Sequence, residues 1–513
     1  MPSRSTSSLV LGGAVALTVA TAVVPTPEGL TPAGQYALAT MVFAGILWVT
    51  GALPLPATAL LVPVWLTVFG VYPAIVGPLA AFADPIIFLL LAGFALAEAL
   101  QAHDLDRRFA YYVVSRLGSS PRRLIGAVML VTAVLSMVIS NTATTALMVP
   151  IAVGVVGEVT GRTEPPSAAD SPSNLHRAML LGTAYAATVG GVGTLVGTPP
   201  NAIVVGQLRT LLGYSITFVD WLAIGLPLVA VSLPLVWYLL TFVIYPPGDH
   251  DVTVARERAR TRLAESGPLS PGGKRALTVF AATALLWILG GLGFIFEGML
   301  PPVVQTTLFG GPGPHLFGSG PHQGVLYFVV VGLLAIPALV VAGAAEFDDL
   351  LDIDWGTLVL FGGGLSLAAA LADTGAIEWL ADLLFGALTS VPLVVLLLAV
   401  VATTVLLGEL ASNTAMAAVL APLLISAGAR YAPMLGTSAT LGSVFLALAG
   451  AIAASFGFAL PVATPPNAIA FGTGWVRRED MLRAGVVLDV VMVLFVSGAL
   501  SLAFRYVWPW LLR

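Results

Sequence analysis

Cysteine is absent from this chain of 513 residues. Disulfide bonds, thiolate catalysis and cysteine metal sites are therefore excluded, and the five histidines lack the spacing of metal ligands. Charged residues are also scarce, at 9% of the chain against about 25% in a soluble protein. Hydrophobic residues make up 58% and the mean hydropathy is +0.98. This composition predicts an all-α polytopic membrane protein.

The apolar segments predict about 11 transmembrane helices and two re-entrant helical hairpins, since a span needs about 20 apolar residues. The first segment is interpreted as a span rather than a signal peptide because no convincing cleavage site follows it. Two apolar segments, 123–158 and 390–428, are longer than one span and are predicted to be the hairpins. The predicted spans cover residues 8–24, 35–52, 54–71, 85–102, 176–195, 217–245, 276–297, 324–344, 356–373, 436–456 and 484–508.

The basic residues indicate an orientation for this topology. With the N-terminus in the cytoplasm and both hairpins returning to the side they enter from, the C-terminus lies outside. Of the 21 basic residues, 17 then lie inside and four outside, as the positive-inside rule requires. The polar segment 246–275, with alternating Arg and Glu, is predicted to be a cytoplasmic linker.

Two short motifs each occur twice, in the same order. The first is Ser-Asn-Thr-Ala, which lies near the middle of each predicted hairpin, and the second is Thr-Pro-Pro-Asn-Ala-Ile. A third pair of similar segments starts with glycine. The three pairs begin at residues 93 and 364, 140 and 412, and 198 and 464, with offsets of 271, 272 and 266 residues. The preserved order predicts a duplication, and the opposite sidedness of the hairpins predicts inverted repeats with a ligand site near the membrane midplane.

The residue types in these motifs suit charged ligands. A hairpin tip exposes unpaired helix N–H groups in mid-membrane, and helix N-termini bind anions. The paired prolines remove backbone donors and free carbonyl groups one turn earlier, which suits a cation such as Na⁺. Ser, Thr and Asn can also serve only as hydrogen-bond links between helices, but the duplication of both motifs favours binding. Glu409, three residues before the second Ser-Asn-Thr, is either a functional carboxylate or a buried structural acid.

At these motifs the chain resembles the divalent anion:sodium symporter family, which includes sodium-coupled di- and tricarboxylate and sulfate transporters of the ion transporter superfamily. The resemblance extends over nearly the whole length and includes the segments 48–54, 88–94 and 355–364. It implies a homodimer with an elevator mechanism, in which a scaffold domain holds a moving transport domain. The implied division is 1–121 and 276–387 for the scaffold, and 122–245 and 388–513 for transport, with the linker 246–275 between the repeats.

The resemblance also implies ligand roles, residue by residue. The substrate carboxylates would be bound by Asn141, Thr142, Asn413 and Thr414, with Thr198, Pro199, Thr464 and Pro465 completing the pocket. One Na⁺ would be held by Ser136, Ser140, Asn141 and the Gly197 carbonyl, and the other by Asn413 with carbonyl groups near Gly408, Ala411 and Ala463. The chain departs from the family at Gly408, where Thr is frequent, and at Gly51, where Glu is frequent.

The sequence therefore predicts Na⁺-driven uptake of a C4-type dicarboxylate such as succinate, malate or fumarate across the plasma membrane. Absence of Lys, Arg and His beside either motif favours sodium coupling over exchange. The alternatives are another permease of the superfamily, such as a sulfate importer, an arsenite exporter, a dicarboxylate exchanger or a Na⁺/H⁺ antiporter. An enzyme is not expected, because the sequence holds no His-Glu zinc motif and no Gly-x-Ser-x-Gly. The expected partners are a small anion, Na⁺ and the lipid bilayer, and not nucleic acid.

Overall fold

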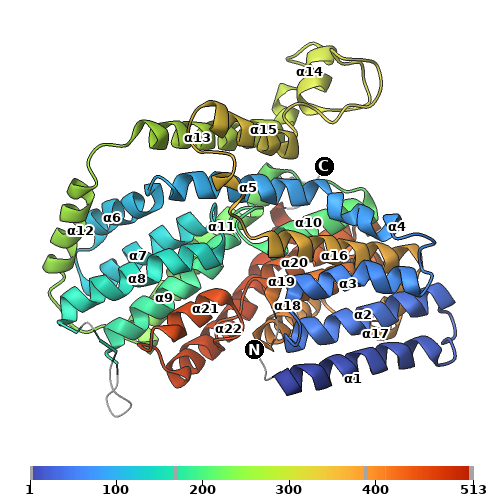
Figure 1. The fold of residues 1–513 in the computed structure, drawn as a ribbon, viewed down its shortest axis with the longest axis horizontal. Helices are drawn as coiled ribbons and strands as arrows, with labels where there is room; N and C mark the ends of the chain where they lie inside the picture. The colour runs from blue at the N-terminus through green and yellow to red at the C-terminus, as the bar shows by residue number, and fades with distance from the viewer. Residues whose placement is uncertain (1–3, 163, 166–171, 386–390, 411, 508–513) are drawn as a thin grey trace.

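A computed structural model describes the whole chain apart from residues 1–3, 163, 166–171, 386–390, 411 and 508–513. The described residues fold into a compact arrangement of helices (Figure 1). The α-helices of the first half are α1 Arg4–Val23, α2 Pro32–Thr50, α3 Leu55–Val68, α4 Val76–Leu79, α5 Pro85–Gln101, α6 Leu105–Leu117, α7 Pro121–Ser136, α8 Asn141–Thr160, α9 Asn174–Gly191, α10 Pro199–Leu212, α11 Phe218–Tyr238 and α12 Thr253–Glu265. Those of the second half are α13 Pro271–Gly291, α14 Pro302–Phe309, α15 Phe328–Val341, α16 Trp355–Asp373, α17 Ala376–Phe385, α18 Leu393–Leu410, α19 Asn413–Leu435, α20 Ala439–Ala454, α21 Pro465–Gly472 and α22 Arg478–Leu502.

Shorter elements complete the described part of the chain. Turns of 3₁₀-helix are η1 Ala80–Ala83, η3 Gly293–Phe296 and η4 Asp349–Leu351, and π-helical turns η2 Leu239–Ile244 and η5 Ala503–Val507 extend α11 and α22. Two isolated antiparallel bridges, Gly311 to His322 and His315 to Gly318, close the loop after α14. β-bridge pairing is thus confined to this loop among the described residues.

Every predicted span contains a helix. Ten helices in the described part of the chain are long and apolar enough to cross a membrane. Both long apolar segments contain two helices: α7 and α8 are joined by residues 137–140, and α18 and α19 lie on either side of residue 411, which is outside the described residues. The prediction of an all-helical membrane fold is confirmed.

The order of elements repeats between the two halves. In each half a hairpin (α7–α8, then α18–α19) is followed by a helix that is broken near the Thr-Pro-Pro-Asn motif. The first broken helix consists of α9 and α10, separated by residues 192–198, and the second of α20 and α21, separated by residues 455–464. A long apolar helix then ends each half, α11 in the first and α22 in the second. The duplication inferred from the motifs therefore extends to the helices around them.

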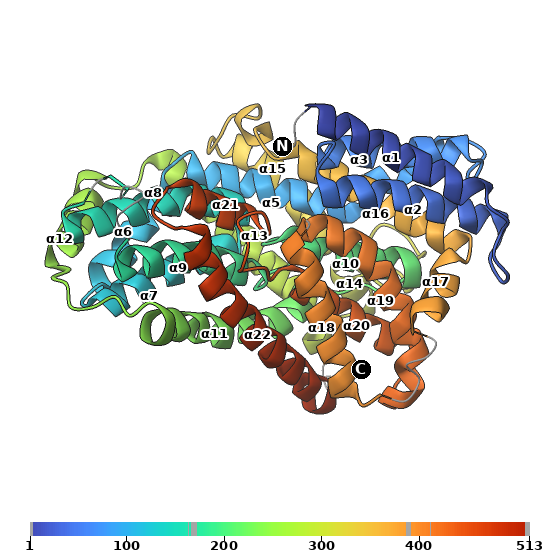
Figure 2. The same cartoon turned by 90° about the horizontal axis from the view of Figure 1, so that it is seen from below.

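The helices gather into two groups. In both views α6 to α9, α12, α21 and the beginning of α22 lie at one end, and α1 to α3, α16 and α17 lie at the other (Figures 1 and 2). The helices α10, α18, α19 and α20 lie beside the second group in Figure 2, below α2 and α16. The first hairpin, α9 and α21 thus lie at the end that carries α12, and the second hairpin, α10 and α20 lie next to α2 and α16.

Small residues allow the broken helices to pack closely. A Cβ atom at Gly190 in α9 would overlap the carbonyl group of Ala133 in α7, and a Cβ atom at Gly485 in α22 would overlap Ala459. Such contacts between backbones are the usual way in which membrane helices gain van der Waals energy. They fix α9 to the first hairpin and α22 to the unwound segment of the second repeat.

Seven described helices lie outside the predicted spans and hairpins: the single turn α4, the half-helices α10 and α21 that follow the Thr-Pro-Pro-Asn motifs, and α6, α12, α14 and α17. Helix α6 packs against α7 and α12, and α12 forms within the predicted linker. The apolar-run criterion misses α6 and α12 because both carry several arginines, and it misses α14 and α17 because they are short. The linker is therefore a folded element that contacts both α6 and α8.

Candidate functional site

All four copies of the two motifs lie at helix N-termini. The helices α8, α10, α19 and α21 begin at Asn141, Pro199, Asn413 and Pro465. Ser140 Oγ accepts a hydrogen bond from the Ala143 amide at 3.3 Å, and Thr464 Oγ1 accepts one from the Asn467 amide at 3.3 Å. The first N–H groups of a helix have no partner within the helix and carry partial positive charge. The hairpin helices α8 and α19 therefore supply N-terminal amide donors for an anion, whereas α10 and α21 begin with two prolines, which have no N–H, and contribute only the partial positive charge of a helix end.

The two repeats cross each other around these helix ends. Helix α21 packs against α8 and α9, and α10 packs against α19 and α20. The hydroxyl of Tyr185 in α9 donates to the Phe458 carbonyl at 2.8 Å, and Gln207 Nε2 in α10 donates to the Ala418 carbonyl at 3.1 Å. Each half-helix that begins with Thr-Pro-Pro-Asn thus contacts the hairpin of the other repeat. The four helix N-termini belong to one interleaved unit.

Oxygen atoms converge on Asn141 at the tip of the first hairpin. Its amide oxygen lies 2.6 Å from Ser136 Oγ, and the same position is 3.1 Å from the Ala187 carbonyl and 3.3 Å from the Gly197 carbonyl. Asn141 Nδ2 donates to Thr198 Oγ1 at 3.4 Å. These oxygens can find a partner in two ways. The Asn141 amide can be rotated by 180°, so that its nitrogen donates to them, or a cation can bind among them. Oxygen ligands of this kind suit a hard cation.

The structure thus brings together Ser136, Asn141 and Gly197 of the predicted first sodium site, and adds Ala187. The fourth predicted ligand, Ser140, is one residue before α8 and caps its first turn. The tip of the first hairpin faces the unwound segment 192–198, because Thr194 donates to the Met137 carbonyl at 2.5 Å. The predicted pairing of each tip with an unwound segment holds in this repeat.

The second tip has a similar arrangement. Asn413 Nδ2 donates to the Ser455 carbonyl at 3.4 Å, and Asn413 Oδ1 is buried with no hydrogen-bond partner among the described residues. Gly408 lies beside this oxygen, since a Cβ atom there would be 3.3 Å from it. Ala463 lies on the far side of the unwound segment, against Gly457. The predicted ligand Ala411 is outside the described residues. A buried oxygen that has no hydrogen-bond donor is available to coordinate a cation.

The remaining predicted substrate residues differ in exposure. Thr198 and Thr464 are buried, at 4% exposure each, whereas Thr142 and Pro465 are exposed. Thr414 and Pro199 are partly exposed. The exposed positions belong to the first turns of α8 and α21, so a ligand can reach the N-termini of these helices.

The Asn of each Thr-Pro-Pro-Asn motif holds the unwound segment in place. Asn201 Nδ2 donates to the carbonyl groups seven and ten residues before it, at 2.8 and 3.1 Å. Asn467 Nδ2 does the same to carbonyl groups seven and ten residues before it, at 3.0 and 2.9 Å. Both asparagines are fully buried. The motif spacing identified these residues, but only the structure assigns them this positioning role.

Two carboxylates hold the unwound segment of the second repeat. Glu409 in α18 accepts from the Ala459 and Leu460 amides, both at 2.8 Å, and Asp489 in α22 accepts from the Phe458 amide at 3.2 Å. The carboxyl groups of Glu409 and Asp489 also lie within hydrogen-bonding reach of each other. Both oxygens of Glu409 are therefore engaged by backbone amides, which gives it a structural role. Sequence reasoning missed Asp489, although it is the lone acid within the last predicted span.

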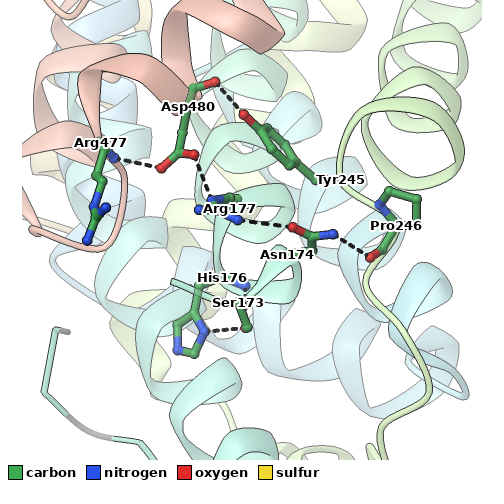
Figure 3. A network of polar contacts seen from close by, with 8 residues as sticks. All are labelled: Ser173, Asn174, His176, Arg177, Tyr245, Pro246, Arg477 and Asp480. Carbon is green, nitrogen blue, oxygen red and sulfur yellow. Dashed lines mark hydrogen bonds and ion pairs between the residues drawn. The ribbon is translucent and has the colours of Figure 1, made fainter. Parts of the chain in front are cut away.

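A polar network joins the two repeats at the end of the molecule that carries α12 (Figure 3). Arg177 at the beginning of α9 forms an ion pair with Asp480 of α22, with Nε and Oδ1 2.7 Å apart. The Tyr245 hydroxyl donates to the Asp480 carbonyl at 2.8 Å, and Asn174 links Arg177 to the Pro246 carbonyl. His176 stacks on Trp475, with ring centroids 3.9 Å apart. The network fixes the start of α9 relative to α22.

Comparison with known proteins agrees with this geometry. The family model described as the sodium:sulfate symporter transmembrane region matches residues 5–512. The chain belongs to the divalent anion:sodium symporter family. The family description indicates a transporter and not an enzyme, with Na⁺ as the coupling ion. The chain is accordingly a multi-span Na⁺-coupled anion transporter.

Individual family members are similar over most of their length. The chain is 36% identical over 473 residues to an uncharacterized transporter of Haemophilus influenzae, with 91% of each chain covered. It is 32% identical over 477 residues to the sodium-dependent dicarboxylate transporter SdcS of Staphylococcus saprophyticus, with 92% of this chain and 86% of the relative covered. Both alignments span both repeats.

Two solved transporter structures share the fold. The YdaH transporter of Alcanivorax borkumensis aligns with a TM-score of 0.55 at 16% identity, with 98% of this chain and 97% of that chain covered. MtrF of Neisseria gonorrhoeae aligns with a TM-score of 0.57 at 15% identity, with 98% and 95% covered. At this identity the likeness concerns the fold alone.

Proposed function

We propose that this family member imports a C4 dicarboxylate together with Na⁺. The observation that carries the proposal is the set of four helix N-termini, α8, α10, α19 and α21, which the crossing of the repeats brings into one unit. A dicarboxylate has two separated negative groups, and each could lie at the N-terminus of one hairpin helix. The name of the Staphylococcus saprophyticus relative, a sodium-dependent dicarboxylate transporter, supports the same substrate class.

In this proposal the hairpin tips bind the substrate. The amides and hydroxyls of Asn141 and Thr142 hold one carboxylate, and those of Asn413 and Thr414 hold the other. The first turns of α10 and α21, at Thr198–Pro199 and Thr464–Pro465, close the pocket. These groups replace the water that solvates the dianion. Burial of an unpaired charge is costly, so several donors together are needed to offset the lost solvation.

The sodium ions occupy the far side of each tip. In the first repeat Ser136, Ser140, Asn141 and the Gly197 carbonyl hold one ion, and the convergence of oxygens on Asn141 supports this assignment. In the second repeat Asn413 and carbonyl groups near Gly408, Ala411 and Ala463 hold the other. More than two Na⁺ per dianion would carry net positive charge inward, and the membrane potential would add about 2.3 kcal/mol per charge per 100 mV.

The larger-scale features of the proposal follow from the repeats. Residues 122–245 and 388–513 form a transport domain that moves against a scaffold of residues 1–121 and 276–387, as an elevator within a homodimer. The N-terminus lies in the cytoplasm of the cell and the C-terminus outside. The network around Arg177 and Asp480 supports a common transport unit, because it joins the two transport segments directly.

Purified protein in liposomes tests the function. With Na⁺ outside and K⁺ inside, labelled succinate should accumulate above its external concentration, and valinomycin with an outward K⁺ gradient should increase the rate if net charge moves. Equal uptake when K⁺ or choline replaces external Na⁺ would contradict sodium coupling. Empty liposomes and the double variant Asn141→Ala, Asn413→Ala provide the controls.

Sulfate is the second candidate substrate, because the matching family model is described by sodium:sulfate symport. Its four oxygens could accept from the N-terminal amides of α8 and α19 and from the hydroxyls beside them. Competition distinguishes a dicarboxylate transporter from a sulfate transporter. An excess of unlabelled malate or fumarate should suppress succinate uptake, whereas sulfate at the same concentration should not. If labelled sulfate accumulates with Na⁺ and succinate does not, sulfate is the substrate.

A further inference from the structure

A cavity of about 380 Å³ lies away from the substrate site, between α6, α8 and α12. Three parts of the protein meet there, because α6 belongs to the proposed scaffold, α8 to the inner hairpin and α12 to the linker. The cavity is open to its surroundings, and its walls are of two kinds, one apolar and one charged. These two walls determine what the cavity can hold.

The apolar wall follows the length of α8. Leu147, Pro150, Ile151 and Val155 line the cavity from one face of this helix, and Val114 of α6 faces it as well. The lining residues of α8 extend from 146 to 158, which corresponds to about 18 Å at 1.5 Å per residue. One leaflet of a bilayer has a hydrocarbon depth of about 15 Å. The wall is long enough for an acyl chain and far too apolar for a free dicarboxylate.

The charged wall lies at the end of α8 remote from Asn141. Arg258 and Arg262 project from one face of α12, four residues apart, and Arg107 lines the cavity from α6. Glu158 is the single acid among the lining residues, and its Oε1 is 3.5 Å from Arg258 NH1. The cavity therefore has three positive groups against one negative group.

The existing ion pairs leave these arginines available. Arg107 pairs with Asp104 and Arg262 with Glu265, but both acids lie outside the cavity lining. All three arginine side chains are more than half exposed. Exposed ion pairs of this kind contribute about 0–1 kcal/mol. A phosphate group, which guanidinium groups bind in a bidentate manner, would compete with them effectively.

We propose that this cavity binds an anionic phospholipid of the cytoplasmic leaflet. The phosphate lies among Arg107, Arg258 and Arg262, and one acyl chain follows α8 along Leu147, Ile151 and Val155. The proposal rests on the orientation proposed above, which puts α12 on the cytoplasmic side, where anionic lipids and clusters of Arg or Lys meet. It is independent of which anion is transported.

A lipid in this position would connect the moving and the fixed parts of the protein. Helix α8 begins at Asn141 in the substrate site and ends at the charged wall, and α6 is tied to the end of α12 because Arg108 donates to the Ser266, Gly267 and Pro268 carbonyls. The bound lipid would contact α8 and this α6–α12 unit together. Membrane composition would then affect the position of the hairpin.

Lipid binding can be measured without transport. Full-length protein in a neutral detergent is titrated with dioctanoyl phosphatidylglycerol, and the thermal unfolding temperature is followed, since a ligand of the folded state raises it. Dioctanoyl phosphatidylcholine and inorganic phosphate are titrated in parallel. The phosphatidylglycerol should raise the unfolding temperature, and the other two should not. An equal rise with inorganic phosphate would overturn the proposal in favour of a soluble-anion site.

Two variants test the two walls. Arg258→Gln with Arg262→Gln removes two charges from the cavity and should weaken phosphatidylglycerol binding about 30-fold, at about 1 kcal/mol per basic residue. Gly154→Leu fills the apolar wall, and a Cβ atom at Gly154 meets nothing within 4 Å, so the fold should tolerate it. This variant should also lose the lipid-dependent rise while retaining all arginines.

A matched control is available on the same helix. Arg256 and Arg260 belong to α12 but do not line the cavity, so Arg256→Gln with Arg260→Gln makes the same change in net charge. This control should bind phosphatidylglycerol like the unmodified protein. If it weakens binding as much as the cavity variant does, the lipid is attracted by general charge and the site does not exist. Failure of succinate uptake in liposomes would leave this binding result unaffected, so the two proposals fail separately.

Discussion

At the scale of single residues, asparagine performs two different tasks at the centre of this transporter. Asn141 and Asn413 are the first residues of hairpin helices. The amide oxygen of Asn141 lies among other oxygens, and the amide oxygen of Asn413 has no hydrogen-bond donor among the described residues. Asn201 and Asn467 use their amide nitrogens to bind carbonyl groups seven and ten residues earlier. In the proposed function the first pair binds ligands, and the second pair preserves the shape of the segments beside them.

Replacement of either tip asparagine should reduce transport while leaving the fold intact. For Asn141→Ala and Asn413→Ala we expect the Na⁺ concentration for half-maximal uptake to rise about 10- to 100-fold, because a hydrogen bond or ligand to a charged group is worth about 1.5–3 kcal/mol. The measurement is succinate uptake in liposomes as a function of external Na⁺.

The control for this prediction is Ser319→Ala in the exposed loop after α14, where the side chain is solvent-exposed. It should transport normally. Wild-type sodium dependence in both asparagine variants would show that the hairpin tips do not bind the ions.

At the scale of elements, the two unwound segments are stabilised in different ways. Residues 192–198 are held by neutral groups, such as the Trp221 indole, which donates to the Val192 carbonyl at 2.9 Å. Residues 455–464 are held in part by the carboxylates of Glu409 and Asp489, which accept three consecutive amides. The sequence repeat is therefore symmetric in its motifs but not in the groups that support them.

Glu409 should matter mainly for the stability of the second unwound segment. Glu409→Ala leaves two buried amides without acceptors, and at about 1.5–3 kcal/mol for each hydrogen bond to a charged group we expect the free energy of unfolding to fall by about 3 kcal/mol or more. Glu409→Gln retains one acceptor oxygen and should cost less. The unfolding temperatures of the unmodified protein and the two variants, measured in detergent, give the order of their stabilities.

The comparison within this series decides between the two roles of Glu409. A structural acid predicts that loss of stability and loss of transport follow the same order, unmodified protein, then Gln, then Ala. If Glu409→Gln abolishes sodium-dependent uptake at unchanged unfolding temperature, the carboxylate acts in transport instead.

The ion pair between α9 and α22 offers a second prediction about elements. The Arg177 and Asp480 side chains are 16% and 11% exposed, so Asp480→Asn leaves a largely buried guanidinium without its counter-charge. We expect a loss of about 3–5 kcal/mol. Arg177→Met with Asp480→Leu removes both charges and should be more stable than the single variant, as thermal unfolding can show. A double variant less stable than Asp480→Asn would contradict this account.

Elements with an apolar run were predictable from the sequence, and elements without one were not. The hairpins and broken helices followed from duplicated motifs, because polar residues and prolines at membrane depth are costly unless they serve a site. Helices α6 and α12 have too many arginines to be detected by hydropathy. Asp489 could have been noticed as an acid in an apolar span, but its contact with Phe458 depends on how α22 packs, which no local pattern encodes.

At the scale of the whole molecule, the crossing of the repeats joins two distant parts of the chain into one packed unit. Helix α10 contacts the second hairpin and α21 contacts the first, so neither repeat forms this unit alone. The ion pair of Arg177 with Asp480 and the contact of Tyr185 with Phe458 add further links between the repeats. In the proposed elevator mechanism the hairpins and broken helices should therefore move together.

The orientation of this assembly in the membrane can be tested directly because the chain contains no cysteine. Single cysteines are introduced at the exposed positions Thr261 in α12, Ser319 after α14 and Met434 at the end of α19. A membrane-impermeant maleimide applied to intact cells should label Ser319→Cys and Met434→Cys, and should label Thr261→Cys only after lysis.

Each pair of positions tests a different part of the topology. One predicted span, 276–297, separates Thr261 from Ser319, so opposite accessibility is required. Two predicted spans and the hairpin 390–428 separate Ser319 from Met434, and the same accessibility follows only if the hairpin returns to the side from which it entered. Labelling of Ser319→Cys with protection of Met434→Cys would mean that this segment crosses the membrane once. The repeats would then no longer be inverted, and the helix N-termini could not approach the substrate from opposite faces.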